Sequence, residues 1–130
     1  MIDLKVLLTK ILDALKVDYV VAEGTDGVWT YCKWASGRYE ATYNGGYTLN
    51  AGTAWQGGYF HETTYGLTLP SFALTWRLKS AIKNDGVLAY CVGIVERNDG
   101  LHLIWVNGVA AAASGSAFGD ATTTITGTWK

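Results

Sequence analysis

One stretch decides the fold: Val28-Trp29-Thr30-Tyr31-Cys32-Lys33-Trp34, followed by Ala35-Ser36-Gly37. Aromatic and β-branched residues dominate the first run, and such residues favour strands. The small residues after it predict a turn, and residues 38–43 predict the antiparallel partner strand. Asn44-Gly45-Gly46 is a further turn signal and is expected to end that strand. The sequence therefore predicts a β-hairpin at residues 28–43.

The same two-residue period continues along the chain from Tyr19 onward. Clusters of Asn, Asp and Gly separate the short runs of β-forming residues, as turns separate strands. Further strands are predicted to begin at Val20 and at residues 59–69, 72–78, 87–95, 101–106 and 122–129, with turns at 24–27, 84–86 and 98–100 and a loop at 110–119. Many short strands with frequent turns are typical of an antiparallel sandwich or barrel. We predict a mainly β chain in which residues 18–130 form an antiparallel β-sandwich, a jelly-roll-like knob.

Residues 1–17 have a different period. The segment 3–16 places apolar side chains on one broad face of a helix, with Asp3 suited to cap its first turn. The apolar face consists of Leu4, Leu7, Leu8, Ile11, Leu12, Ala14 and Leu15. So short a helix is marginal in water on its own, so its apolar face needs a partner.

Two surfaces can bury this helix. It can pack on the sheet of its own domain, or it can associate with other copies of itself. Leu4, Leu7, Ile11 and Ala14 follow heptad spacing, and the extra leucines widen the stripe beyond that of a dimeric coiled coil. Because two heptads are short for a coiled coil, an oligomer must also use the β region. We predict an N-terminal oligomerisation helix at residues 1–17, with Leu4, Leu7, Leu8, Ile11 and Leu15 as the oligomerisation residues of a trimer.

The amino-acid composition excludes several classes of function. The 130 residues have 10 Lys and Arg against 11 Asp and Glu, a net charge of −1, so the chain lacks the basic footprint of a nucleic-acid-binding protein. Hydrophobic residues make up 49% of the chain and charged residues 16%, which excludes disorder as its main state. No apolar run approaches the length of about 20 residues that spans a membrane, so no membrane insertion is expected. Asp3, Lys5 and Lys10 interrupt the N-terminal apolar residues, so we expect no signal peptide and synthesis in a cytoplasm.

The inventory of chemically active residues is small. His61 and His102 belong to no metal-binding spacing, and His102 alternates with leucines as a solvent-facing strand residue does. The aspartates beside glycines are typical of turn caps, so no carboxylate pair for glycoside hydrolysis stands out. Cys32 and Cys91 lie in predicted strands and are expected to be free, buried thiols, with a disulfide between them as the alternative. We therefore predict no enzyme, no cofactor and no metal, and a hydrolase acting on cell-wall glycan is the least favoured class.

Aromatic residues are unusually frequent, and they are the residue class that says most about function. The chain has 6 Trp and 8 Tyr, and such rings serve cores, interfaces and ligand platforms alike. Core positions are favoured for Trp29, Trp34, Trp76 and Trp105. The segment 50–58 has no strand pattern and is predicted to be a loop. The predicted saccharide-binding set comprises Trp55 in this segment and the flanking Tyr47 and Tyr59 for stacking, with Asn50 and Gln56 for hydrogen bonds. The alternative for Trp55 is a place over a sheet edge or in a subunit interface.

The run Trp29-Thr30-Tyr31-Cys32-Lys33-Trp34-Ala35-Ser36-Gly37, followed by Glu40, has the form W-x-Y-x-K-W-x-S-G-x-x-E. It is similar to a signature in C-terminal domains of tail, baseplate and tail-fibre proteins of phages and prophages. Looser matches are the Leu67-Thr68-Leu69-Pro70 run and the C-terminal Thr-Trp-Lys. One departure is Ala41-Thr42, where relatives often have Cys-Trp.

The resemblance implies a virion structural domain, a β-sandwich knob that is usually trimeric and sits at the tip of a tail appendage. It implies three partners: further copies of the chain, other tail or baseplate proteins, and a host cell-surface glycan. A free-standing lectin-like carbohydrate-binding protein is the alternative, against which the expected lack of a secretion signal counts.

Overall fold

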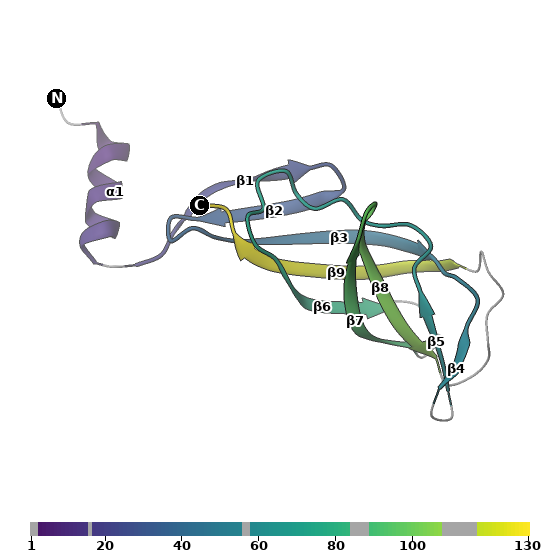
Figure 1. Ribbon diagram of the computed structural model, residues 1–130. Coiled ribbons are helices and arrows are strands. Elements are labelled where there is room, and N and C mark those ends of the chain that lie inside the picture. The colour runs from purple at the N-terminus through teal and green to yellow at the C-terminus, as the bar shows by residue number, and fades with distance from the viewer. Residues whose placement is uncertain (1–2, 16, 56–57, 84–88, 108–116) are drawn as a thin grey trace.

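One helix precedes two antiparallel β-sheets in the computed structural model, which describes residues 3–15, 17–55, 58–83, 89–107 and 117–130 (Figure 1). The elements are α1 (Leu4–Ala14), β1 (Val20–Asp26), β2 (Trp29–Trp34), β3 (Arg38–Thr48), β4 (Thr53–Trp55), β5 (Gly58–Glu62), β6 (Arg77–Lys83), β7 (Ala89–Arg97), β8 (Gly100–Asn107) and β9 (Ala117–Thr128). The predicted fold class, an antiparallel β-sandwich after a short N-terminal helix, is confirmed.

The larger sheet has five strands in the order β1-β2-β3-β9-β6. The predicted hairpin at its centre is confirmed, since β2 pairs antiparallel with β3 across a turn that contains Gly37 with a φ of 96°. Strand β9 then inserts between β3 and β6, which are far apart in the sequence. This insertion brings residues near the start of β3, the start of β6 and the end of β9 to one region of the sheet.

The smaller sheet has four strands in the order β4-β5-β8-β7. Strands β7 and β8 form a hairpin across the turn predicted at 98–100, with Arg97 paired to Gly100. The segment predicted as a loop at 50–58 instead contains β4, whose Trp55 pairs with Gly58 of β5. That prediction is therefore wrong, because backbone pairing with β5 can hold a short strand that has no alternating pattern of its own.

Two clusters of buried side chains fill the space between the sheets. One contains Trp29, Tyr39, Ala41, Leu101 and Ile125, and the other contains Tyr47, Leu49, Leu103, Trp105 and Ala121. Each cluster takes residues from both sheets, as expected of a sandwich core. The core prediction is confirmed for Trp29 and Trp105, which are 1% and 0% exposed, whereas Trp34 and Trp76 are only half-buried.

Several strand boundaries differ from those predicted. Strand β1 runs through Gly24 to Asp26, and the turn follows at Gly27, whose φ is 58°. Strand β3 continues through Asn44-Gly45-Gly46, with an irregularity in its register between Gly45 and Tyr47. Strand β6 begins at Arg77 rather than ending at residue 78. Where a partner strand supplies hydrogen bonds, these glycine-containing segments thus form bulges or ordinary strand positions instead of the predicted turns.

Helix α1 stands away from both sheets (Figure 1). The Asp3 carboxylate accepts a hydrogen bond of 2.9 Å from the Lys5 amide, which confirms the predicted cap. No residue of α1 is buried, and α1 contacts none of the strands in the described part of the chain. Packing of the helix on its own sheet, one of the two alternatives, is therefore wrong. No helix in the described ranges is long and apolar enough to span a membrane.

Candidate functional site

Tyr47, predicted as an exposed stacking residue, is instead part of the core. Its side chain is 6% exposed, and its hydroxyl lies 2.5 Å from Thr123 Oγ1. Its ring packs against Tyr43 and Trp105, with centroid separations of 5.5 and 6.0 Å. Burial also raises the pKa of Tyr47. The prediction of Tyr47 as a ligand-binding residue is wrong, because β3 extends past the glycines that were expected to end it.

The other predicted binding residues do not form one described surface. Tyr59 is half-buried in β5, where it pairs with Asn107 of β8. Asn50 is exposed, but its Oδ1 accepts a hydrogen bond of 3.0 Å from Thr64 Oγ1. Trp55 lies in β4, and Gln56 lies outside the described residues. Saccharide binding by Trp55, Tyr59, Asn50 and Gln56 stays a prediction.

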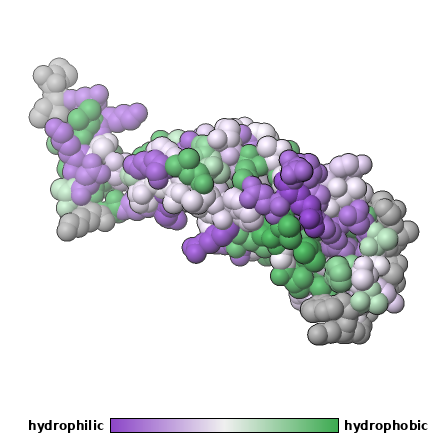
Figure 2. Space-filling model, in the orientation of Figure 1, coloured by the Kyte–Doolittle hydropathy of each residue, from purple (hydrophilic) through white to green (hydrophobic). Residues whose placement is uncertain are grey.

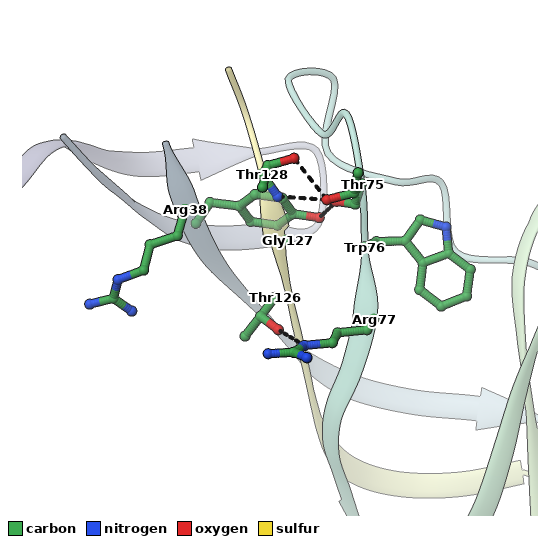
Figure 3. Close-up of a pocket in the computed structure, with 8 residues that line it drawn as sticks. Arg38, Thr75, Trp76, Arg77, Thr126, Gly127 and Thr128 are labelled. Atoms are coloured by element: carbon green, nitrogen blue, oxygen red, sulfur yellow. Dashed lines mark hydrogen bonds between the residues drawn. The ribbon is translucent and has the colours of Figure 1, made fainter. Parts of the chain in front are cut away.

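A cavity of about 510 Å³ opens instead on the five-stranded sheet, beside the end of β9 (Figure 3). Its lining comes from the start of β3, the start of β6 with the residues before it, and the end of β9. The lining residues are Arg38, Tyr39, Thr75, Trp76, Arg77, Thr126, Gly127 and Thr128. Two arginines are among them and no acidic residue is, in a chain whose net charge is −1.

The strand register places both arginines on one face of the sheet. Arg38 is paired with Thr128, and Arg77 is paired with Thr126, two residues earlier on β9. Residues that are directly paired in a sheet, and residues two apart on one strand, point to the same face. Figure 3 shows the Arg38 and Arg77 side chains extending to the same side of β9, whereas Trp76 turns the other way. The two arginines thus lie on the same face of the sheet, on the two strands that flank the threonines of β9.

Gly127 allows this cavity to exist. The segment before β6 crosses β9 so closely that a Cβ atom on Gly127 would lie 1.9 Å from the carbonyl oxygen of Thr75. Hydrogen bonds hold the crossing: the Leu74 amide donates to the Thr128 carbonyl at 2.8 Å, and the Thr128 amide donates to Thr75 Oγ1 at 2.9 Å. From the core side, the Tyr39 hydroxyl donates to the Thr75 carbonyl at 2.9 Å, and burial raises the pKa of Tyr39 to about 12.

The polar groups of the cavity are mostly hydrogen-bond donors. Arg77 Nε donates to Thr126 Oγ1 at 3.3 Å, which leaves the Thr126 hydroxyl hydrogen unused. Thr75 Oγ1 and Thr128 Oγ1 lie 2.8 Å apart, and whichever of them donates, one hydroxyl hydrogen of the pair is left over. The remaining N–H groups of Arg77 have no acceptor in the described part of the chain. Such a set of donors suits a ligand group that only accepts hydrogen bonds, such as a carboxylate or a phosphate oxygen.

Arg38 is held by neighbours from the motif that first predicted the fold. Its guanidinium carbon lies 3.8 Å from the centre of the Trp34 ring, and its Nε donates to Asp18 Oδ2 at 3.0 Å. Asp18 also accepts hydrogen bonds from the amide and the hydroxyl of Ser36, at 3.0 and 2.7 Å. Stacking on Trp34 and pairing with Asp18 fix the direction of the Arg38 side chain, whose guanidinium points away from Thr126 and Arg77 (Figure 3).

The remaining motif residues have structural contacts. Trp29 Nε1 donates to the Thr68 carbonyl at 2.7 Å, and Tyr31 packs edge-on against Phe72. The Lys33 ammonium lies 4.2 Å from the centre of the Phe72 ring. Glu40 accepts a bond of 2.8 Å from Lys79. The motif therefore stabilises the five-stranded sheet and the segment that covers it. Arg38 and Tyr39, at its last two variable positions, line the cavity.

A second polar cluster lies at the turn between β7 and β8. His102 is 6% exposed, so the prediction that it faces solvent is wrong. Its Nδ1 lies 2.7 Å from the Thr63 carbonyl oxygen, and its Nε2 lies 2.6 Å from Asp99 Oδ1. Arg97 forms two hydrogen bonds to Glu62, which in turn lies 3.3 Å from His102. Because protein groups already hold each member, this cluster stabilises the turn and offers no vacant ligand position.

Because of this cluster, the free energy of unfolding is expected to change with pH in the acidic range. The hydrogen bond from Arg97 lowers the pKa of Glu62, and the hydrogen bond from His102 lowers the pKa of Asp99. Both carboxyls lose their protons more readily in the folded chain, so their stabilisation is present above the usual carboxyl pKa of about 4 and is lost as the pH falls through the lower folded values. We expect the urea midpoint to fall as the pH is lowered from about 5 to about 2. Glu62→Gln should weaken this dependence, and an unaltered pH profile in that variant would contradict the assignment.

The thiols and the histidines do not add a reactive centre. Cys32 of β2 and Cys91 of β7 are free and half-buried, so the expectation of free thiols agrees with the structure while full burial does not. Burial raises the pKa of both thiols, which makes them poor nucleophiles. His61 is buried, with Nδ1 3.2 Å from the Asn50 carbonyl oxygen. Within the described ranges, no group of three or more His, Cys, Asp and Glu is placed to hold a metal ion.

Comparison of the chain with protein-family models, with curated proteins and with solved structures found no match. The cavity beside β9 was not predicted from the sequence. The one signal that points to it is the alternation of threonine on β9, at Thr122, Thr124, Thr126 and Thr128. That pattern predicts a hydroxyl-lined face, but it does not tell which strands flank it.

Proposed function

We propose that the chain is a phage-derived virion structural protein, a tail or baseplate tip domain that assembles as a trimer and contacts saccharide on the host cell surface. Its partners in this proposal are further copies of itself, other tail or baseplate proteins, and the host glycan. It acts by binding and assembly rather than by catalysis. The motif resemblance suggests the virion setting, and the exposed helix is the single observation that carries the assembly.

The apolar face of α1 has no partner within the described part of the chain. Leu4 and Leu15 are 78% and 65% exposed, and Leu7, Leu8 and Ile11 are also exposed. A solitary helix of 11 residues is marginally stable in water, so this face gains most by packing against other helices. The stripe is wider than that of a two-stranded coiled coil, which favours three copies.

The β region offers a second apolar surface for the same assembly. Phe60, Val92, Ile104 and Val106 line a shallow apolar groove on the outer face of the four-stranded sheet. Figure 2 shows hydrophobic residues gathered where Figure 1 draws β7 and β8. Because a two-heptad helix holds copies together only weakly, a contribution from this surface supports a stable trimer.

The trimer is tested by the mass of the purified chain in solution. We expect a trimer at micromolar concentration, and Leu7→Asp with Ile11→Asp should convert it to a monomer, because two carboxylates cannot be buried in an apolar helix interface. Lys5→Gln with Thr9→Asp is a control that changes the charge equally on the polar face and should remain trimeric. A monomeric unchanged chain, or a trimer that survives the Leu7 and Ile11 changes, would refute the role of the helix.

Host contact is tested on the same protein with a glycan array and with whole cells. A specific saccharide signal from a trimer is the expected result. A saccharide signal from a monomer would favour the free-standing carbohydrate-binding module instead. Binding to neither glycans nor cells would overturn the adhesive part of the proposal.

A further inference from the structure

The cavity beside β9 combines positive charge with unused hydrogen-bond donors. Arg38 and Arg77 flank it, and hydroxyl hydrogens remain available at Thr126 and at the Thr75–Thr128 pair. Arg38 and Arg77 lie on strands separated by β9 and are offset by two residues along it, so their backbones are about 12 Å apart.

Neighbouring carboxylates leave the charge of Arg77 uncancelled. Asp18 accepts hydrogen bonds from Ser36 and from the Nε of Arg38, so it pairs with Arg38 and not with Arg77. Glu40 lies opposite Thr126 in the register, but the Lys79 ammonium pairs with it at 2.8 Å. Arg77 therefore supplies the positive charge of the cavity, since it has no carboxylate partner in the described part of the chain.

We propose that this cavity is a binding site for an anionic group, a carboxylate or a phosphate, carried by a surface glycan. Arg77 and the Thr126 hydroxyl together bind the anionic oxygens. That the bound group is anionic is inferred from the cavity itself. That a glycan carries this group rests on the proposed function. The site lies on the five-stranded sheet and is separate from the segment at residues 50–58.

Titration of the purified, full-length chain with small probes tests the site. The probes are glucuronate for a carboxylate, glycerol phosphate for a phosphate, and glucose as the neutral counterpart of glucuronate, each followed by amide chemical shifts. We expect an anionic probe to bind, with shifts at Arg77, Thr126 and Gly127, and glucose to leave those shifts unchanged. Binding should weaken as salt is added, because the site is open to solvent. The stronger anionic probe identifies the source of the charge.

Two variants assign the binding to named groups. Arg77→Gln should weaken binding by about tenfold, as expected for loss of a charge-assisted contact. Thr126→Val keeps the shape of the side chain and should also weaken binding. This second variant keeps the test valid if Arg77→Gln fails to fold. Lys10→Gln removes an equal charge from the remote helix and should bind like the unchanged chain. Absence of binding for both anionic probes at tens of millimolar, or equal binding by all three variants, would overturn the proposal.

Failure of the anion site can be distinguished from failure of the proposed function. The titration uses isolated protein and small probes, so it succeeds or fails without reference to trimers or cells. Probe binding by a chain that adheres to no cell would refute the proposed function and leave the anion site intact. Cell adhesion by an unchanged chain that binds neither anionic probe would support the proposed function and refute the anion site.

Discussion

Trp29→Ala is expected to lower the free energy of unfolding by about 4 kcal/mol, since removal of a buried tryptophan ring leaves a large cavity. Trp29 is 1% exposed and lies at the centre of the cluster between the two sheets. Its Nε1 donates to the Thr68 carbonyl at 2.7 Å, and its ring packs edge-on against Tyr43. The substitution therefore removes both apolar packing and the bond that fastens residues 67–70 over the core.

Trp34→Ala is a matched control, because it removes the same ring from the same strand on the opposite face. Trp34 is half-buried, and the described contact of its ring is the stacked Arg38 guanidinium. Loss of that contact should cost about 1 kcal/mol, as for an exposed cation–π pair. Urea unfolding followed by far-ultraviolet circular dichroism compares the two. Equal destabilisation by both substitutions would contradict the division of β2 into a buried and an exposed face.

The difference between Trp29 and Trp34 also shows what periodicity can predict. Alternation along β2 separates their faces without a structure, because adjacent strand residues point to opposite sides. Alternation alone does not say which face is buried or how deeply. It also failed at His102, which is enclosed by Asp99, Glu62 and the Thr63 carbonyl, groups that come from two separate segments.

Turn signals were less dependable than periodicity. Asn44-Gly45-Gly46 was expected to end a strand, yet β3 continues there because β9 supplies the hydrogen-bonding partner. The placement of Tyr47 in the core follows from this continuation. A turn signal records local backbone preference, whereas hydrogen bonds from a neighbouring strand can hold the same residues extended. The sequence alone does not state which strand will be the neighbour.

The cavity beside β9 could not be predicted for the same reason. Its arginines are 39 positions apart in the sequence numbering, at 38 and 77, and they meet only because β9 inserts between β3 and β6. The helix is the opposite case. Its cap and apolar face depend on neighbouring residues, so they were predicted from the sequence, and the structure adds that no strand covers the apolar face.

Gly127→Ala is expected to lower the free energy of unfolding by about 3 kcal/mol and the melting temperature by about 10 °C. The added methyl group would lie 1.9 Å from the Thr75 carbonyl oxygen and 2.9 Å from the Tyr39 ring. Since neither the crossing backbone nor the buried ring can move freely, the segment before β6 must lift away from β9. That movement breaks the bonds between Leu74 and Thr128 and between Tyr39 and Thr75.

Gly93→Ala provides the matched control within a strand of the other sheet. A Cβ atom on Gly93 would meet no atom within 4 Å, so its alanine variant should unfold like the unchanged chain or at a slightly higher temperature. Thermal unfolding compares the two alanine variants. The Gly127 variant, examined below its lowered melting temperature, should also lose binding of anionic probes, because Thr75 and Thr128 no longer hold the wall beside Arg77. Full stability in Gly127→Ala would mean that the crossing at Thr75 is not as close as the structure places it, and the cavity would then lose the feature that forms it.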